Sequence, residues 1–129
     1  MAKGIEIREA HFPGRAPIDA YGNGGFRFAE MSHRGSILCL PSGIHGWEPA
    51  TPPVLSVSDL GAVLEHASDI EILLVGTGVD LRRIPEEVRA VLRQHHISPD
   101  PMSTGAAVRT YNVLLAEDRA VAAALIAVD

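Results

Sequence analysis

Two segments in the second half of the chain carry the residues whose types and spacing suit ligand binding. In the first, an apolar run over residues 70–75 predicts a strand buried on both faces, and it opens into the turn Gly76-Thr77-Gly78. Ligands of open α/β sheets bind at the carboxyl ends of strands, where glycines let backbone N–H groups approach an anion closely. Leu81 stands where a dinucleotide-binding pattern needs its third glycine, so the pattern is degenerate. Two interpretations stay open: an anion site, and the favoured one, a tight strand exit that needs a positive φ.

The second segment is a helix predicted over residues 104–116, for which Ser103 or Thr104 can act as the N-cap. At about 100° per residue, Arg109 and Asn112 lie about 60° apart, among apolar neighbours. We therefore predict a candidate pocket for an anion or carboxylate, formed by Thr104, Arg109, Asn112 and the preceding Gly-Thr-Gly turn. In the alternative interpretation, which is the favoured one, Arg109 pairs with a structural acid or with backbone carbonyls, because ionic networks are often structural.

The sequence contains none of the common catalytic or metal-binding patterns. Its only lysine is Lys3, so no phosphate-loop or Schiff-base lysine is available in the body of the fold. Its only cysteine, Cys39, lies in an apolar run and is expected to be a buried structural thiol. The adjacent His95 and His96 point to different sides of a predicted helix and lack metal-ligand spacing. We therefore predict no catalytic residue, no metal and no cofactor, and favour a protein that is not an enzyme.

Composition restricts the class of protein further. The chain has 129 residues, 47% of them hydrophobic and 21% charged, which is typical of one globular domain, here taken as residues 1–129. The net charge of −5 argues against nucleic acid as a partner. No apolar stretch has the length of a signal peptide or a membrane helix, and one cysteine suits a reducing compartment. The expected location is the cytoplasm.

The order of predicted elements indicates an α/β or α+β fold. Short strands separated by glycine-rich turns are expected in the first half, around residues 5–7, 18–21, 26–28, 31–34 and 36–40. A loop rich in proline and glycine follows, in which Trp47 is either a plug of the core or an exposed anchor for a partner. The second half then alternates between strands and three helices, which predicts parallel pairing through right-handed crossovers. In it, Pro85 is expected at the first position of a helix, and Pro99 ends a short strand that begins at Ile97.

The chain resembles a known family of domains of uncharacterised function, which includes the mitochondrial assembly factor of respiratory complex I (NADH:ubiquinone oxidoreductase). The segments that carry the resemblance are Tyr21–Arg27, Gly35–Leu38, Trp47, Ile72–Gly78, Met102–Glu117 and Arg119–Val128, of which residues 104–126 are the most specific. The resemblance is to the bacterial branch of this family. It implies a three-layer β/β/α single domain, with early antiparallel strands and a mixed or parallel sheet carrying three helices.

Two functions follow as hypotheses. The resemblance implies an interaction or assembly protein without a reaction of its own, whose partner is a protein and belongs to a membrane-associated complex. The alternative is a binding protein or enzyme for a small anionic ligand, held by the Gly-Thr-Gly turn and Arg109. Self-association into a homo-oligomer is compatible with both hypotheses.

Overall fold

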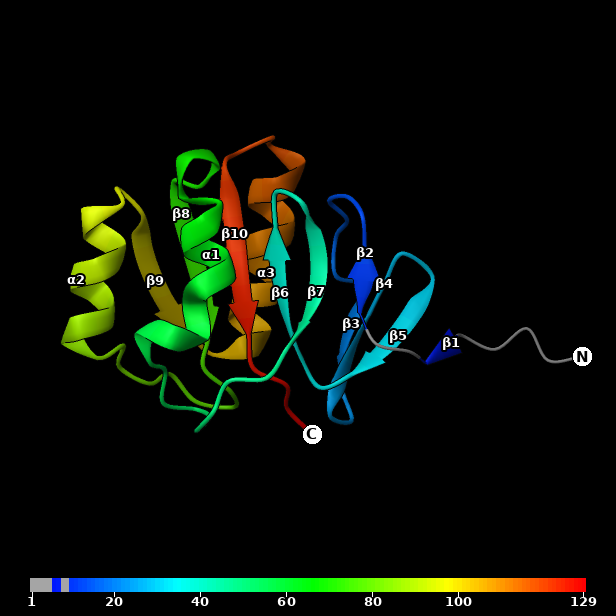
Figure 1. Cartoon of the computed structure of the whole chain (residues 1–129). Coiled ribbons are helices and arrows are strands. Elements are labelled where there is room, and N and C mark those ends of the chain that lie inside the picture. The colour runs from blue at the N-terminus through cyan, green and yellow to red at the C-terminus, as the bar shows by residue number, and fades with distance from the viewer. Residues whose placement is uncertain (1–5, 8–9) are drawn as a thin grey trace, which may run out of the picture.

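The computed structural model describes residues 6–7 and 10–129, which form ten strands and three α-helices (Figure 1). The strands are β1 (Glu6–Ile7), β2 (His11–Phe12), β3 (Ala20–Gly22), β4 (Gly25–Phe28), β5 (Met31–Arg34), β6 (Ser36–Leu40), β7 (Gly43–Trp47), β8 (Ile72–Gly76), β9 (Ser98–Met102) and β10 (Val121–Leu125). The helices are α1 (Gly61–Glu65), α2 (Glu86–Gln94) and α3 (Thr104–Ala116), with short 3₁₀ turns η1 (Val57–Leu60) and η2 (Ala67–Asp69).

The strands form two sheets. The larger has six strands in the order β2-β7-β6-β10-β8-β9, and the smaller has four in the order β1-β5-β4-β3. Strand β8 pairs in parallel with both β9 and β10, whereas β2, β7, β6 and β10 pair with one another in antiparallel fashion. In the smaller sheet β3, β4 and β5 are antiparallel, and β1 joins β5 in parallel. The predicted mixed α/β architecture is confirmed, with mainly antiparallel strand pairs in the first half of the chain and parallel pairs in the second half.

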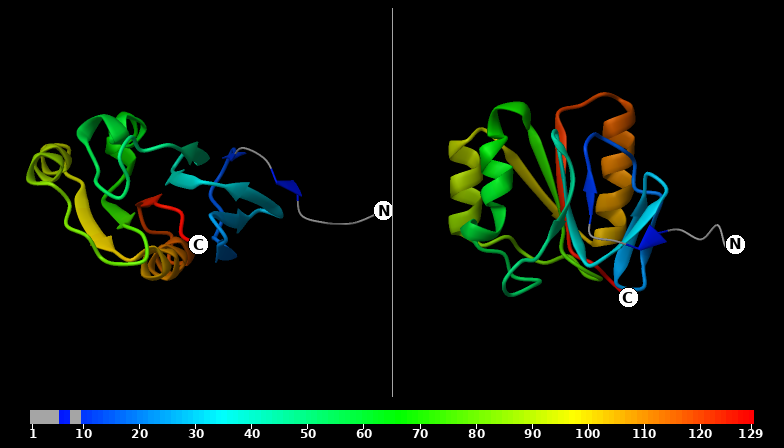
Figure 2. Two further views of the ribbon diagram at one scale, coloured as in Figure 1. Left: turned by 90° about the horizontal axis from the view of Figure 1, so that it is seen from below. Right: turned by 45° about the vertical axis from the view of Figure 1, so that its right-hand side comes forward.

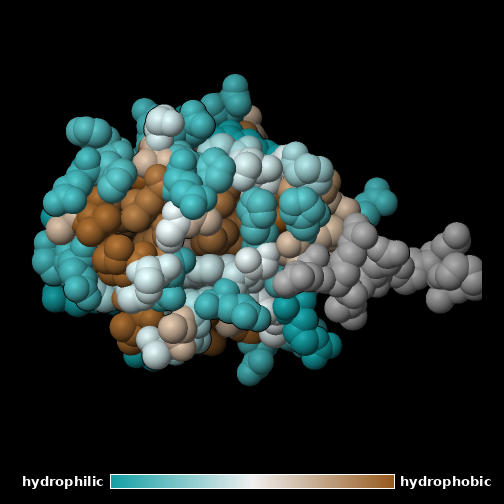
Figure 3. Space-filling view, viewed as in Figure 1, coloured by the Kyte–Doolittle hydropathy of each residue, from teal (hydrophilic) through white to brown (hydrophobic). Residues whose placement is uncertain are grey.

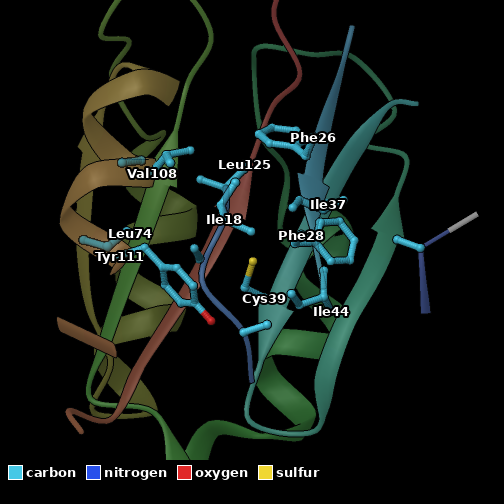
Figure 4. Packing of buried hydrophobic residues seen from close by; sticks show 14 of the residues in the cluster. Ile18, Phe26, Phe28, Ile37, Cys39, Ile44, Leu74, Val108, Tyr111 and Leu125 are labelled. Carbon is cyan, nitrogen blue, oxygen red and sulfur yellow. The ribbon is translucent and has the colours of Figure 1, made fainter. Parts of the chain in front are cut away.

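The six-stranded sheet is the central layer of the molecule. Helices α1 and α2 cover one of its faces, and the four-stranded sheet lies over the other together with α3 (Figures 1 and 2). Successive side chains of a strand point to opposite faces, and both faces are buried here. Strand β6 therefore sends Leu38 and Leu40 toward α1 and α2, and Ile37 and Cys39 toward α3 and the smaller sheet (Figure 4). This double burial explains why β6, β8 and β10 are almost entirely apolar.

Several local predictions are confirmed. The sequence Ser56-x-x-Asp59 has the pattern of a capping box, and the box is present, although it starts the 3₁₀ turn η1 rather than a regular helix. Helix α3 begins at Thr104, and the side chain of Ser103 accepts a hydrogen bond from the N–H of Ala106. Helix α2 begins one residue later than expected, at Glu86. Pro85 is its N-cap residue, because its ψ of 145° is extended rather than helical.

Two strands were not predicted. The proline- and glycine-rich stretch after residue 40 contains β7, and its last residue, Trp47, is 8% exposed. Trp47 therefore plugs the core, and its indole N–H donates to the carbonyl of Asp59. The second strand, β2, has only two residues and pairs with β7 at the edge of the sheet. Neither segment shows a long alternating pattern, so tertiary pairing determines both.

The strand after Ile97 also differs from its prediction, because Pro99 and Pro101 lie inside β9 instead of ending it. Strand β9 is the edge of the six-stranded sheet. The N–H of Ser98 donates to the carbonyl of Glu71 on the β8 side, so alternate residues, the two prolines, face the open edge. Proline has no N–H to lose there, and the edge offers no donors to an additional strand.

None of the helices in the described part of the chain combines the length and the hydropathy needed to cross a bilayer.

Candidate functional site

The carboxyl end of β8 and the start of α3 meet in a buried junction formed by Gly76, Gly78 and Thr104. The side chain of Thr104 is fully buried. Its hydroxyl donates to the carbonyl of Ile126 at 2.7 Å and accepts from the N–H of Gly78 at 3.0 Å. The N–H of Thr104 donates in turn to the carbonyl of Gly78 at 2.8 Å. One threonine therefore joins the ends of β8 and β10 to the first turn of α3.

Thr77 organises the loop that follows β8. Its hydroxyl donates to the carbonyl of Asp80 at 2.7 Å and shares this hydrogen with the carbonyl of Met102 at 3.1 Å. The same hydroxyl accepts from the N–H of Arg82 at 2.9 Å. The N–H of Thr77 donates to the carbonyl of Met102. The hydroxyls of Thr77 and Thr104 are thus used within the fold, at the sheet end where α/β proteins commonly bind their ligands.

Gly76 and Gly78 each occupy the turn for a different structural reason. A Cβ at Gly76 would lie 3.0 Å from both the Cδ2 of Leu125 and the Cα of Thr104, so the close approach of α3 favours glycine. Gly78 has a φ of +105°, in the region that side-chain-bearing residues rarely adopt. The tight strand exit considered for this turn is therefore present.

Asn112 forms a clamp between α3 and the smaller sheet. Its amide oxygen accepts from the N–H of Ile18, and its amide nitrogen donates to the carbonyl of Ile18, both at 2.9 Å. Ile18 lies just before β3. Asn112 thus hydrogen-bonds both the backbone N–H and the backbone carbonyl of Ile18, as a residue of a neighbouring strand would. Asn112 therefore holds the smaller sheet against the helix.

Arg109 is placed apart from the other five predicted residues. It is exposed, whereas Val108 and Tyr111 on the same helix are buried. Five residues after Thr104, it lies about 140° around the helix axis from the buried junction. The structure thus brings together Gly76, Thr77, Gly78 and Thr104, gives Asn112 a separate contact and leaves Arg109 at the surface. Binding of an anion by Arg109 stays a prediction.

Burial keeps the thiol of Cys39 unreactive. Desolvation raises its pKa to about 12, and a hydrogen bond with Tyr111 opposes that rise only in part. Burial likewise raises the pKa of the Tyr111 hydroxyl, and its contact with Cys39 adds to the rise. Both side chains lie in the core between α3 and the smaller sheet (Figure 4). The expectation of a structural thiol at Cys39 is confirmed.

Two histidines lie together at the edge of the larger sheet. The rings of His11 and His45 have centroids 5.7 Å apart on the paired strands β2 and β7. Burial lowers the pKa of His45, and the nearby His11 and His66 lower it further. Within the described ranges, no three His, Cys, Asp or Glu side chains are arranged to hold a metal ion.

Sequence reasoning missed two surface features. The loop between β8 and α2 exposes Val79 (77% exposed) and Leu81 (64% exposed), large apolar side chains next to a turn. The outer face of the smaller sheet carries Arg27 and Arg34, both exposed, beside a hollow. The signal for the arginines was available in the alternation of Phe26-Arg27-Phe28, which places Arg27 opposite the buried face.

Comparison with solved structures supports the same fold. A protein described as an outer membrane protein of Bartonella henselae is 68% identical, and the match covers 92% of this chain and all of that one with a TM-score of 0.89. A Bordetella pertussis protein described as a Mth938-like domain is 25% identical, with a TM-score of 0.74 over 93% of this chain and 92% of its own.

Comparison with curated sequences identifies the family. An uncharacterized protein of Rhodobacter capsulatus is 41% identical over 119 residues, 92% of this chain and 90% of that protein. The mouse (Mus musculus) NADH dehydrogenase (ubiquinone) 1 alpha subcomplex assembly factor 3 is 29% identical over 122 residues, which are 95% of this chain but 66% of the factor. The model of the family described as "Protein of unknown function (DUF498/DUF598)" matches residues 18–126. The chain belongs to this DUF498/DUF598 family.

Proposed function

We propose that this protein is a non-enzymatic assembly factor that binds a subunit of a respiratory NADH dehydrogenase while the complex is being built. The similarity to the animal assembly factor supports this direction. The observation that carries the proposal is the loop between β8 and α2, which presents Val79 and Leu81 to solvent. Contiguous exposed apolar patches mark protein–protein interaction sites, and Val79 and Leu81 lie two residues apart on one loop.

The hydrogen bonds of this loop favour a protein partner over a small ligand. The hydroxyl of Thr77 binds the backbone of both Asp80 and Arg82, so Val79 and Leu81 project from a braced turn. A pre-organised loop loses little conformational entropy when a partner covers it. At the same end of the sheet, the buried polar groups that would orient a small ligand are already satisfied within the fold.

A second apolar feature supports the same function. Figure 3 shows apolar side chains gathered over α1 and α2, on the side of the sheet away from α3. Between the two helices, the partly exposed Val57, Leu64 and Val91 adjoin the buried Leu60, Val88 and Leu92. The loop with Val79 and Leu81 leads into α2, so a partner that covers the loop can extend over the partly exposed apolar side chains between the helices. We infer that this combined surface is the docking face.

The expected partner is apolar in the region that it buries, as is a subunit of a membrane-associated complex before its neighbours join. In this proposal the partner is bound from the cytoplasmic side of the membrane. A homo-oligomer formed through the same face is the competing occupant. It would appear as a concentration-dependent mass in sedimentation.

Deletion of the gene in the organism that carries it tests the proposal. We expect less assembled NADH dehydrogenase on native gels, accumulation of subcomplexes, and recovery when the wild-type chain is expressed. The double variant Val79→Ser/Leu81→Ser should fold normally but fail to restore the complex, because its docking loop is no longer apolar.

The matched control is Val113→Ser, since Val113 is an equally apolar residue, 57% exposed, on α3. This variant should restore assembly fully. Normal levels of assembled complex in the deletion strain would overturn the assembly function. Full restoration by the double variant would instead overturn the assignment of the loop.

A further inference from the structure

The outer face of the four-stranded sheet has an unusual distribution of side-chain sizes. Its inner face packs Phe26, Phe28 and Met31 into the core. Strand alternation therefore turns Arg27 and Arg34 outward, and both are exposed. The remaining outward positions on β3, β4 and β5 are small, namely Ala20, Gly22, Gly25 and Ser32.

The small residues leave a hollow between the two arginines. Its volume is about 380 Å³, and its lining includes Arg27, Arg34, Ser32 and Asn23. Gly25 has no side chain to fill the floor of the hollow. The position requires glycine, because a Cβ there would collide with the backbone carbonyl of His33. The hollow therefore follows from the close pairing of β4 and β5, and a larger residue at Gly25 would have to distort that pairing.

The strand register places the two guanidinium groups within reach of one ligand. Arg27 pairs with Ser32, so Arg34 is its diagonal neighbour on the next strand. Diagonal neighbours on one face of an antiparallel pair are about 7–8 Å apart, a distance that long side chains bridge easily. The Ser32 hydroxyl lies on the same face, directly across from Arg27, and adds a hydrogen-bond donor.

Neither arginine is neutralised within the described part of the chain. No carboxylate there lies within ion-pair distance of Arg27 or Arg34, whereas Arg93 does contact Glu86 at 3.7 Å. Glu48 lines a second hollow of about 250 Å³, which Arg34 also lines, without forming an ion pair with it. Two unpaired cations side by side repel each other, and this arrangement is relieved when an anion binds between them.

We propose that this hollow binds a phosphate group between Arg27 and Arg34. A guanidinium presents a planar fork of N–H donors that engages two oxygens at once. A carboxylate has two oxygens and is saturated by one such fork, whereas a phosphate has enough oxygens for both arginines and for the Ser32 hydroxyl. The site is separate from the Gly76–Gly78 turn and from the docking loop, so it adds a ligand to the proposed assembly function and does not depend on it.

The phosphate can come from a free phosphorylated molecule or from the headgroup of an anionic lipid. Both sources offer the same chemistry to the two arginines. The open hollow on a sheet face is accessible to either. Two arms of one experiment distinguish them.

In the first arm, inorganic phosphate is titrated into the full chain at constant ionic strength, and the arginine side-chain and Ser32 backbone signals are followed by NMR. We expect saturable shifts at Arg27, Arg34 and Ser32. The variants Arg27→Gln and Arg34→Gln should each weaken binding about tenfold or more, because each removes one charged fork. The control Arg83→Gln removes an exposed arginine beside α2 and should leave the titration unchanged.

In the second arm, the protein is sedimented with vesicles of phosphatidylcholine, with and without phosphatidylglycerol. The site is assigned to a lipid headgroup if vesicle binding needs phosphatidylglycerol and is lost in both Arg27→Gln and Arg34→Gln. Saturable binding of inorganic phosphate without vesicle binding assigns it to a free phosphorylated molecule. The proposal is overturned if neither arm gives binding, or if Arg83→Gln weakens binding as much as the variants in the hollow.

Discussion

Replacement of Thr104 by valine tests the buried junction between β8, β10 and α3 directly. Valine has nearly the shape of threonine, so packing is kept while the hydroxyl is lost. The carbonyl of Ile126 and the N–H of Gly78 then lose their hydrogen-bond partner within the fold. An unsatisfied buried group costs about 1–3 kcal/mol, and the Gly78 N–H, which is only partly buried, costs about 1 kcal/mol, so we expect Thr104→Val to lower the free energy of unfolding by about 2–4 kcal/mol.

Thermal and urea unfolding, followed by circular dichroism, provide the measurement. For a chain of this length, each kcal/mol corresponds to about 4 °C, so Tm should fall by about 8–16 °C. Thr104→Ser keeps the hydroxyl and loses one buried methyl, and it should cost about 1 kcal/mol. Thr110→Val makes the same change at a half-buried position of α3 and should stay within about 0.5 kcal/mol of the wild type.

The relative stabilities of Thr104→Val and Thr104→Ser test the role of the hydroxyl. If Thr104→Val is no less stable than Thr104→Ser, the hydroxyl does not hold the three elements together. The junction would then be available for a ligand, and the explanation of this turn as structural would be refuted.

Three further predictions concern other parts of the fold. Asn112→Ala removes both hydrogen bonds to Ile18 and should cost about 1–3 kcal/mol in urea unfolding, with hydrogen exchange increasing at Ile18 rather than throughout the chain; uniform exchange would contradict a local clamp. Gly25→Ala should destabilise by about 2 kcal/mol or more because its Cβ meets backbone, whereas Gly105→Ala, whose Cβ meets only the end of an exposed tyrosine side chain, should stay within about 1 kcal/mol of the wild type in the same assay. Burial raises the pKa of Cys39 to about 12 in the folded protein, against an ordinary value of 9.0, so the unfolded chain releases this proton first and stability should decline as pH rises from 9.0 toward 12. Cys39→Ala should remove that part of the pH dependence, and native protein that reacts with iodoacetamide as fast as unfolded protein would disprove the burial of the thiol.

Much of the fold could be predicted because the longest elements satisfy local rules. Helix α3 has an N-cap at Ser103 and apolar residues at helical spacing, and its predicted range is the one observed. The apolar run before Gly76 predicted a strand covered on both faces, which β8 is. The short strands were harder, since β2 has two residues and β7 contains two glycines. Pairing with neighbouring strands, rather than intrinsic propensity, determines such segments.

The candidate site was predicted in part for the same reason. Helical spacing specifies that Arg109 and Asn112 are three residues apart on α3, but it does not specify which neighbour each one meets. Asn112 contacts the backbone of Ile18, which is 94 residues away in the sequence. The hydroxyl of Thr104 likewise contacts the carbonyl of Ile126. No local pattern encodes such distant hydrogen bonds.

By itself the sequence determined the longer elements, the mixed sheet and the unreactive thiol, because periodicity, capping and apolar runs act over a few residues. Only the tertiary structure decided how the polar residues are used. It buried the hydroxyl of Thr104 in a junction and left Arg109 exposed to solvent. It also placed Arg27 and Arg34 on neighbouring strands, around a hollow lined by small residues. These outcomes depend on strand register and on the rotation of α3 about its axis, which are set by the packing of the whole core.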